Sequence, residues 1–284
     1  MSNKKYLLFV PHGGLNDCFT MTARAINYCR DNNRILLLDY TNSPYKINFS
    51  DYLYFSDDMD IEIISDSNVI RELISNNNFS VYPKQFDLKC FMENNIDVKY
   101  TPKGYLLNNE VLLEFPKMKL EEDIVFHTNC GGGMAGFKLF RNLKLKNKLK
   151  KVINDKLKLL KNEYASVQVR NTDYVCKYQD QYHRHKEELF KSKDCVYVAT
   201  DNKDVLDFFK SKGLKIFNFT TFPSTKFINL FVSDVDSHTK FCDVFVDIFA
   251  LTKSQHLFSN SHGFFIKLIR ECRNHKDEIL EKLK

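Results

Sequence analysis

The clearest chemical signal in the sequence is an apolar strand that runs directly into a polar cluster. Ser166 to Val169 are predicted to form a buried strand, and Arg170, Asn171 and Asp173 follow it. A guanidinium at the carboxyl end of a parallel strand can hold a phosphate through two hydrogen bonds, and a nearby carboxylate can fix its rotamer. The alternative is an Arg–Asp surface pair that only closes the strand. The pattern makes Arg170 a candidate phosphate ligand supported by Asp173.

A second apolar strand ends in the same manner. Val196 to Ala199 are followed by Thr200 and Asp201, and a helix is predicted to begin directly afterwards. Capping of that helix is the default role of these two side chains. Because the ends of parallel strands share one edge of a sheet, Thr200 and Asp201 are also candidates for the same site as Arg170.

A third segment combines a helix with a turn. Asp243 and Asp247 are four residues apart and therefore share one face of a predicted helix. Ser261, His262 and Gly263 then form a turn ahead of another apolar helix, where backbone amides attract anions. Ordinary capping by Ser261 is the alternative for this turn.

The N-terminus predicts a strand, a glycine turn and a helix. The apolar run 6–10 ends before Gly13 and Gly14, and a helical pattern begins at Asn16. With the next apolar run, 34–40, these residues form a β-α-β unit whose glycine loop lies where parallel sheets bind ligands.

Further along, a strand over 122–127 precedes three consecutive glycines at 131–133, which suit either a hinge or a close approach to ligand. A second α/β series follows, with strands at 165–169, 195–199 and 214–217, and helices at 203–212, 241–253 and 264–283. The expected fold is therefore α/β, with two Rossmann-like domains, 1–140 and 141–284, facing each other across a cleft.

The lysine-rich run 138–161 is predicted to form the long amphipathic helix that joins these domains. A surface for acidic partners is the second interpretation, and it leaves peripheral contact with a membrane open. The segment 177–188, with His183 and His185, is expected to be an exposed loop that could face an acceptor.

Composition excludes several classes of protein. The chain has 284 residues, 43% hydrophobic content and a net charge of +6, without zinc-finger spacing or an aromatic–basic stripe, so nucleic acid binding is not expected. Eight scattered cysteines without a CxxC pair indicate reduced thiols and a cytoplasmic protein. No stretch is long and apolar enough for a signal peptide or a membrane span.

In this order and spacing, the segments resemble the fucosyltransferase superfamily of α1,2-, α1,6- and protein O-fucosyltransferases. The family's strand ends in His-x-Arg-Arg-x-Asp, which is similar to the stretch from Gln168 to Asp173. Its Thr-Asp turn, helix aspartate and serine-rich phosphate loop are similar to Thr200-Asp201, Asp247 and the segment 259–263. Its early glycine loop, Gly-Gly-Leu-Gly-Asn-Gln or Gly-Gly-Leu-Asn, is similar to Gly13-Gly14-Leu15-Asn16-Asp17.

The resemblance implies a GT-B fold and an inverting transfer from a GDP-sugar, with GDP-fucose as the donor and a glycan or glycoconjugate as the acceptor. Arg170 would stabilise the departing diphosphate, helped by the amides of the turn 261–263, and Asp247 would bind the guanine edge, with Asp243 as its alternative. The implied donor-binding residues are Gly13, Gly14, Asn16, Gln168, Asn171, Thr200, Asp201, Asp247, Ser261, His262 and Gly263. Gln168 stands where the family has histidine, and Asn171 where it has the second arginine.

The general base and the metal are separate questions. Loop carboxylates able to accept the acceptor's proton are Asp17, Asp173 and Asp180. The triplets Asp58-Met-Asp60 and Asp234-Val-Asp236 match a metal-binding pattern, but solvation is their better interpretation. With Arg170 and loop amides supplying positive potential, neither a metal nor another cofactor is expected.

Three alternatives remain open. A transferase could use another nucleotide sugar, GDP-mannose or a UDP-sugar. The same scaffold could be a non-catalytic nucleotide- or carbohydrate-binding module. An interaction protein built around residues 138–161 would bind anionic polymers and no nucleotide.

Overall fold

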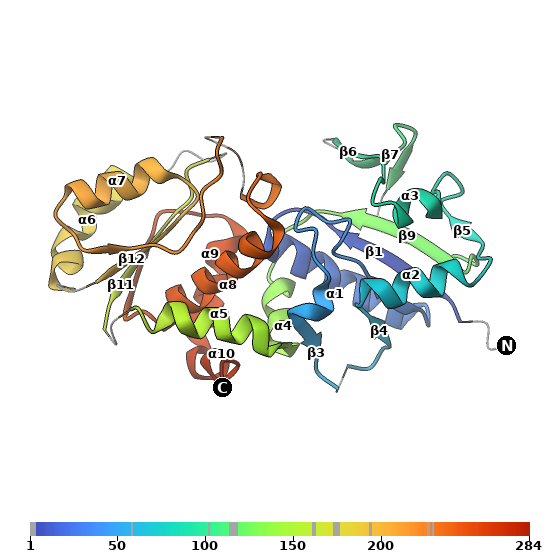
Figure 1. The fold of residues 1–284 in the computed structure, drawn as a ribbon, viewed down its shortest axis with the longest axis horizontal. Helices are drawn as coiled ribbons and strands as arrows, with labels where there is room; N and C mark the ends of the chain where they lie inside the picture. Colours follow the sequence, from blue (N-terminus) through green and yellow to red (C-terminus); the bar gives the residue numbers. More distant parts are fainter. Residues whose placement is uncertain are drawn as a thin grey trace. The chain divides into compact units, whose positions relative to one another are not determined.

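The computed structural model describes residues 4–57, 59–101, 103–113, 119–160, 163–172, 177–192, 195–225, 228 and 230–284. The chain divides into two compact units, Met1–Lys146 and Asn147–Lys284. The predicted domain boundary after residue 140 stays a prediction. Figure 1 shows the elements of each unit along the chain.

The N-terminal unit is built on a parallel sheet of five strands in the order β4-β2-β1-β9-β5. The strands are β1 (Tyr6–Pro11), β2 (Ile35–Leu38), β4 (Ile63–Ile64), β5 (Val81–Tyr82) and β9 (Ile124–Asn129). Every residue of β1 and β2 is buried, as expected for apolar parallel strands covered on both faces. The β-α-β unit predicted at the N-terminus is present.

The other elements of this unit complete its core. They are α1 (Leu15–Asp31), the 3₁₀ turn η1 (Phe49–Asp51), α2 (Ser67–Ser75), α3 (Leu88–Met92), α4 (Ala135–Asn142), β3 (Leu53–Phe55), β6 (Val98–Thr101), β7 (Gly104–Leu107), β8 (Val111–Leu113) and β10 (Leu143–Leu145). One face of the sheet, with Leu8 and Phe126, packs on α2, α3 and the antiparallel β6–β7–β8 sheet. Helix α1 contacts β1 and packs on α4.

The C-terminal unit has a parallel sheet of four strands in the order β13-β12-β11-β14. Its elements are α5 (Asn147–Leu157), β11 (Ala165–Val169), α6 (Tyr178–Lys191), β12 (Val196–Thr200), α7 (Lys203–Ser211), β13 (Ile216–Phe217), η2 (Leu230–Val232), α8 (Ser237–Lys253), β14 (His256–Ser259), α9 (Phe264–Asn274) and α10 (Lys276–Glu281). Val167 and Val198 belong to the core formed with α6 and α7. Since strand side chains alternate, Gln168 and Tyr197 lie on the opposite face of the sheet. On that face, the Tyr197 hydroxyl donates to Asp247 of α8.

The predicted long helix over 138–161 is wrong. Helix α4 ends at Asn142, and residues Leu143–Leu145 form β10, which pairs antiparallel with β3. Leu143 and Leu145 are buried while Lys144 is exposed, a period of two that belongs to a strand. Helix α5 then begins at Asn147. The spacing of the lysines did not reveal that the chain changes from helix to strand and back to helix.

Two other expectations need correction. The charged segment 177–188 is helix α6 and not a loop, because Tyr178, Tyr182 and Leu189 line one helical face and pack on the α7 side of the sheet. The single helix expected over 264–283 is two helices, α9 and α10, which meet at His275.

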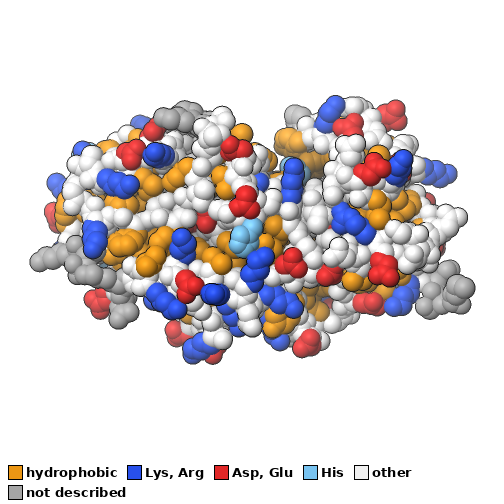
Figure 2. Space-filling model, viewed as in Figure 1, with side chains coloured by type: hydrophobic (Ala, Val, Ile, Leu, Met, Phe, Trp, Pro, Cys, Tyr) orange, Lys and Arg blue, Asp and Glu red, His pale blue; other side chains and the backbone are white. Residues whose placement is uncertain are grey.

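The surface view in Figure 2 shows Lys and Arg side chains interspersed with Asp and Glu across the face drawn. On this face, the positive charges are not gathered into one continuous stripe. This distribution is typical of a solvated surface.

Candidate functional site

The carboxyl ends of three neighbouring strands bring the predicted segments of the C-terminal unit together. In the parallel register, Gln168 on β11 pairs with Ser259 on β14, and Val169 pairs with Thr200 on β12. Arg170, Asp201 and the turn 261–263 therefore follow strands that end side by side. The sequence prediction that these segments share one edge is confirmed for the described residues.

Asp201 ties the chain that follows Arg170 to the end of β12. Its carboxylate accepts the Asn171 N–H at 2.7 Å and the Thr172 hydroxyl at 2.8 Å. Burial raises the pKa of the Asp201 carboxyl, while the Asn171 N–H, the Thr172 hydroxyl and the Arg170 charge oppose that shift. The Thr-Asp turn thus positions the arginine loop. Asp173, which was expected to fix the rotamer of Arg170, lies outside the described residues.

Asn202, which the sequence analysis did not single out, completes this connection. Its side-chain amide donates to the Asn171 carbonyl at 3.0 Å, and its oxygen accepts the Asp204 N–H at 2.8 Å as the N-cap of α7. The signal that could have found it is an asparagine at the predicted start of a helix. Helix capping and positioning of the Arg170 loop are therefore performed by one side chain.

A relay of hydroxyl groups fastens the opposite loop to β11. The Ser259 hydroxyl donates to Gln168 Oε1 at 2.7 Å and accepts the Ser261 N–H at 3.1 Å. The Ser261 hydroxyl in turn accepts the Arg170 N–H at 3.4 Å. Ser261 therefore fixes the backbone beside Arg170 instead of capping α9.

Arg170 lies next to the N-terminus of α9. A Cβ built on Gly263 would be 4.0 Å from Arg170 Nη1, and Gly263 is the N-cap of α9. Within the described residues, no side chain caps this helix end by a hydrogen bond. The first amides of a helix carry a partial positive charge, which repels a guanidinium unless an anion lies between them. This arrangement suits a phosphate or diphosphate. The exposed His262 is part of the same turn.

The two aspartates of α8 already have protein partners. The Tyr197 hydroxyl donates to Asp247, and burial raises the pKa of Asp247 to about 7, with Thr220 and Tyr197 lowering it. Asp243 accepts the Thr221 N–H at 2.7 Å, and burial raises its pKa as well. Both carboxylates thus anchor the segment after β13, and binding of guanine by Asp247 stays a prediction.

The glycine loop of the N-terminal unit is tightly packed. Gly13 has φ +96°, and a Cβ there would lie 2.5 Å from Cys130 Sγ. Gly14 donates its N–H to Asp17 Oδ2 at 3.2 Å. This carboxylate, a candidate base, therefore takes part in capping the N-terminus of α1. Asn16 is buried, and its amide donates to the Gly133 carbonyl at 3.2 Å. The roles of Gly13, Gly14 and Asn16 in donor binding stay predictions.

The three glycines at 131–133, for which a hinge and a ligand approach were weighed, lie against α1. A Cβ on Gly131 would be 3.2 Å from Met21 Sδ, and one on Gly133 would be 3.2 Å from Thr20 Cγ2. Thr20 also donates its hydroxyl to the Gly133 carbonyl at 3.1 Å. Close packing on the helix is a third reason for glycine here.

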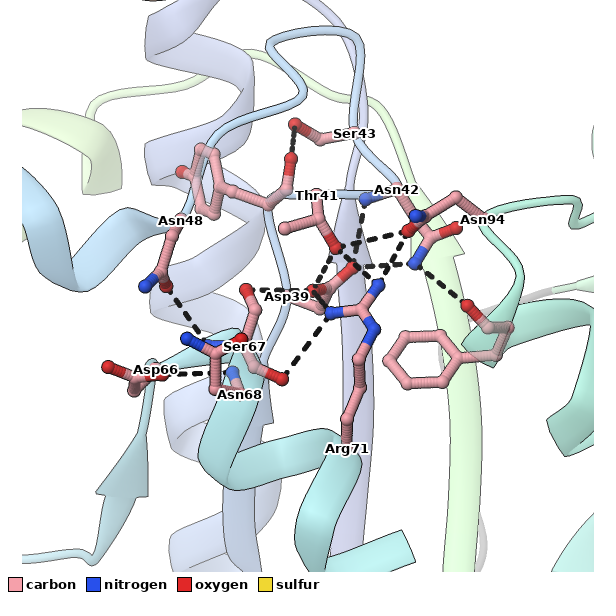
Figure 3. A network of polar contacts seen from close by, with 12 residues as sticks. Asp39, Thr41, Asn42, Ser43, Asn48, Asp66, Ser67, Asn68, Arg71 and Asn94 are labelled. Carbon is pink, nitrogen blue, oxygen red and sulfur yellow. Dashed lines mark hydrogen bonds and ion pairs between the residues drawn. The ribbon is translucent and has the colours of Figure 1, made fainter. Parts of the chain in front are cut away.

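The sequence analysis did not identify the polar network at the end of β2, which Figure 3 shows. The Asp39 carboxylate is fully buried and accepts the Thr41 hydroxyl at 2.7 Å and the Ser67 hydroxyl at 3.2 Å. Arg71 lies 3.9 Å from Asp39 and donates to Thr41 and Asn94 at 2.9 and 2.6 Å. The network connects the end of β2 with α2 and with Asn94, which follows the C-cap of α3.

The residues of the two DxD triplets are engaged elsewhere. Asp60 receives two hydrogen bonds from Arg30, at 2.5 and 2.7 Å, and Asp58 lies outside the described residues. Asp234 accepts the Ser224 N–H at 3.3 Å, while Asp236 caps α8. Across the described ranges, no group of three or more His, Cys, Asp or Glu residues is arranged to hold a metal ion.

The candidate residues on α6 lie in the N-terminal part of this helix. Asp180 is in the first turn, His183 is exposed, and the His185 ring stacks on Phe258 at 4.4 Å between centroids. No helix in the described part of the chain is long and apolar enough to cross a membrane.

Each of the two units is an α/β unit built on a parallel sheet, and in the C-terminal unit polar side chains gather at the carboxyl edge of that sheet. Neither a protein-family model nor a curated protein matches the chain. Among solved structures, it is similar to NodZ alpha-1,6-fucosyltransferase co-crystallised with GDP, at 15% identity and TM-score 0.58, covering 94% of this chain and 92% of that chain. The fucosyltransferase NodZ from Bradyrhizobium matches with 15% identity, TM-score 0.58 and coverages of 94% and 93%.

The chain is also similar to POFUT1 in complex with GDP-fucose, at 10% identity, TM-score 0.54 and 96% coverage of both chains. The mixed α/β fold with parallel sheets is therefore that of the GT-B fucosyltransferase structures. The resemblance expected from the short motifs is confirmed at the level of the fold.

Proposed function

We propose that this protein is an inverting glycosyltransferase that transfers fucose from GDP-fucose to a hydroxyl of a glycan or glycoconjugate, without a metal ion. Support comes from the fold shared with fucosyltransferases whose structures hold GDP or GDP-fucose. The N-terminal unit would bind the acceptor, and the C-terminal unit the donor.

The observation that carries the proposal is the placement of Arg170 at the N-terminus of α9. In glycosyl transfer, the bond from the sugar to the diphosphate breaks, and negative charge grows on the departing oxygen. A fixed guanidinium and helix amides at that oxygen stabilise the transition state more than the bound donor. Asp201 and Ser261, which hold the backbone on either side of Arg170, would reduce the reorganisation required.

Metal independence follows from the same chemistry. The guanidinium and the α9 amides supply the positive potential that a divalent ion supplies elsewhere. Asp60, Asp234 and Asp236 have other partners. Transfer should therefore be the same in EDTA as in Mg²⁺ or Mn²⁺, and restoration of a lost activity by Mn²⁺ would refute this part of the proposal.

The nucleotide base is the part of the donor with the least structural support. Gln168 is bonded to Ser259 and Asp247 to Tyr197, so neither is committed to guanine by its surroundings. Use of GDP-mannose or a UDP-sugar is the alternative that these contacts leave open. Thermal shift with GDP, UDP and ADP in parallel separates them, and a preference for UDP would exclude guanine recognition by these two residues.

The decisive experiment compares Arg170→Ala with Arg270→Ala, a surface arginine of α9, in GDP binding and in transfer from GDP-fucose to an acceptor panel. Loss of a guanidinium that acts in the transition state should lower transfer at least about 10³-fold with the fold intact. Arg270→Ala should behave like the wild type. Unchanged transfer by Arg170→Ala would remove Arg170 from the mechanism, and GDP binding without transfer or hydrolysis on any acceptor would indicate a binding module.

A further inference from the structure

The first turn of α9 exposes a large apolar side chain next to Arg170. Gly263 is the N-cap of this helix, and a Cβ built on it would lie 4.0 Å from Arg170 Nη1. Phe264 follows directly and is 40% exposed, whereas Ile266 and Leu268 of the same helix are buried. Phe264 therefore presents its ring to solvent at the edge of the proposed phosphate site.

Lys267 places its charge over this ring. Its Nζ lies 4.8 Å from the ring centroid of Phe264, a distance at which a cation is attracted to the face of an aromatic ring. The two residues are three positions apart and share one face of the helix. Because helix side chains lean toward the N-terminus, the ammonium is directed back toward the end of α9 at which Arg170 lies. Phe264 therefore fixes where the charge of Lys267 is held.

Two cations and a helix N-terminus thus gather in one region of the C-terminal unit. The first amides of α9 carry a partial positive charge, and none of the described residues in its first turn is acidic. The Asp201 carboxylate interacts with the Arg170 charge. Within the described part of the chain, Glu271 forms no ion pair with Lys267, although it follows one turn later on the same helix. One carboxylate does not neutralise two cations and a helix N-terminus, so the region attracts an anion.

We propose that Lys267 is a further donor-binding residue, whose ammonium supplies a second positive charge for the diphosphate beside Arg170. This inference rests on the proposed function and concerns the C-terminal unit alone. A diphosphate carries more negative charge than one guanidinium neutralises, and the residue after Arg170 is the neutral Asn171. Lys267 supplies the additional charge from α9.

The role of Phe264 is to position this ammonium. A lysine side chain on the surface exchanges between rotamers, and fixing one of them when a ligand binds costs entropy. Contact with the ring lowers that cost, because the ammonium is held near the helix N-terminus before the nucleotide binds. The diphosphate is negatively charged both in GDP and in the sugar nucleotide, so loss of Lys267 should change affinity and KM more than kcat.

The test measures the affinity of the wild type, Lys267→Gln, Lys267→Arg and Phe264→Leu for GDP and GMP by calorimetry, at low and at high salt. Lys267→Gln should weaken GDP binding about 5- to 20-fold and GMP binding by a smaller factor, because GMP carries less negative charge. The loss should shrink at high salt. Lys267→Arg keeps the charge and should retain most of the affinity. Phe264→Leu should weaken GDP binding about 2- to 5-fold.

Arg270→Gln is the matched control, because it removes one charge from an exposed residue of α9 that lies further from the helix N-terminus. This variant should bind GDP like the wild type. Wild-type GDP affinity in folded Lys267→Gln would overturn the inference, as would an equal loss in Arg270→Gln or equal losses for GDP and GMP. If the wild type binds no GDP, the proposed function itself fails. Binding by the wild type without any loss in Lys267→Gln refutes only the role of Lys267.

Discussion

At the scale of single residues, the C-terminal unit uses two carboxylates of the same type for different purposes. Asp201 receives a backbone N–H and a hydroxyl, bonds that stabilise its charged form and orient the Arg170 loop. Burial raises the pKa of Asp247 to about 7 and Asp243 adds to that shift, while the hydrogen bond from the Tyr197 phenol opposes it. Environment rather than residue type therefore distinguishes a positioning anion from a group that titrates near neutrality.

The raised pKa of Asp247 predicts a dependence of stability on pH. Its pKa is about 7 when folded and 3.8 in an unperturbed chain, so its contribution is complete below 3.8 and is lost as the pH rises through about 7. Asp247→Asn removes this loss. Without nucleotide at pH 8, the variant should exceed the wild type in unfolding free energy by roughly 1–4 kcal/mol. Denaturant titrations at pH 4 and pH 8 measure the difference, and a variant less stable at pH 8 would contradict the pKa.

At the scale of elements, the strand ends of the N-terminal unit are held by contacts between loops distant in sequence. The turn after β1 touches Cys130, which follows β9, and α1 holds the Gly133 carbonyl through Asn16 and Thr20. Glycine is required at position 13 for two reasons: its φ is positive, and a Cβ would overlap with Cys130 Sγ. Gly213 shares only the first requirement, with φ +78° and no atom within 4 Å of a built Cβ.

Gly13→Ala should therefore be more destabilising than Gly213→Ala. The left-handed backbone alone costs an alanine roughly 1–2 kcal/mol, and overlap with the Cys130 sulfur adds roughly 1–3 kcal/mol. Replacing Cys130 by alanine in the Gly13→Ala background should recover most of the second part, which a double-mutant cycle isolates. Equal losses for the two single glycine variants would show that the Cys130 contact relaxes freely.

The network at the end of β2 makes a second prediction for this unit (Figure 3). Asp39→Ala leaves Arg71 without its buried carboxylate and should destabilise the protein by about 3–5 kcal/mol. Asp66→Ala, which removes the N-cap of α2 and the hydrogen bonds of Asp66 with Ser50 and Asn48, should cost about 1 kcal/mol. Chemical denaturation of both variants gives the comparison. A loss for Asp39→Ala no larger than for Asp66→Ala would show that water replaces the carboxylate.

At the scale of the whole molecule, the sequence predicted what depends on local pattern. Continuous apolar runs followed by glycine or polar turns located β1, β11 and β12 and placed Arg170 and Asp201 at one edge. Prediction from the sequence failed where partners distant in the chain decide the local structure. Strand β10 forms by pairing with β3, and α6 buries its apolar face against α7. The contacts of His12 with Tyr105 and of Asp39 with Arg71 join residues 93 and 32 positions apart, beyond any motif.

The final prediction concerns how the two units respond to nucleotide. If the donor binds at Arg170 and α9, GDP should slow amide hydrogen exchange in the segments 168–172, 200–202 and 261–266, because hydrogen bonds to phosphate and ordering of these loops suppress local opening. The strands β1 and β2 of the N-terminal unit should exchange at the same rate with and without GDP. Arg170→Ala should show no protection of the three segments at the same GDP concentration. Protection confined to the glycine turn at Gly13 would place the nucleotide in the other unit and contradict the assignment of the donor site.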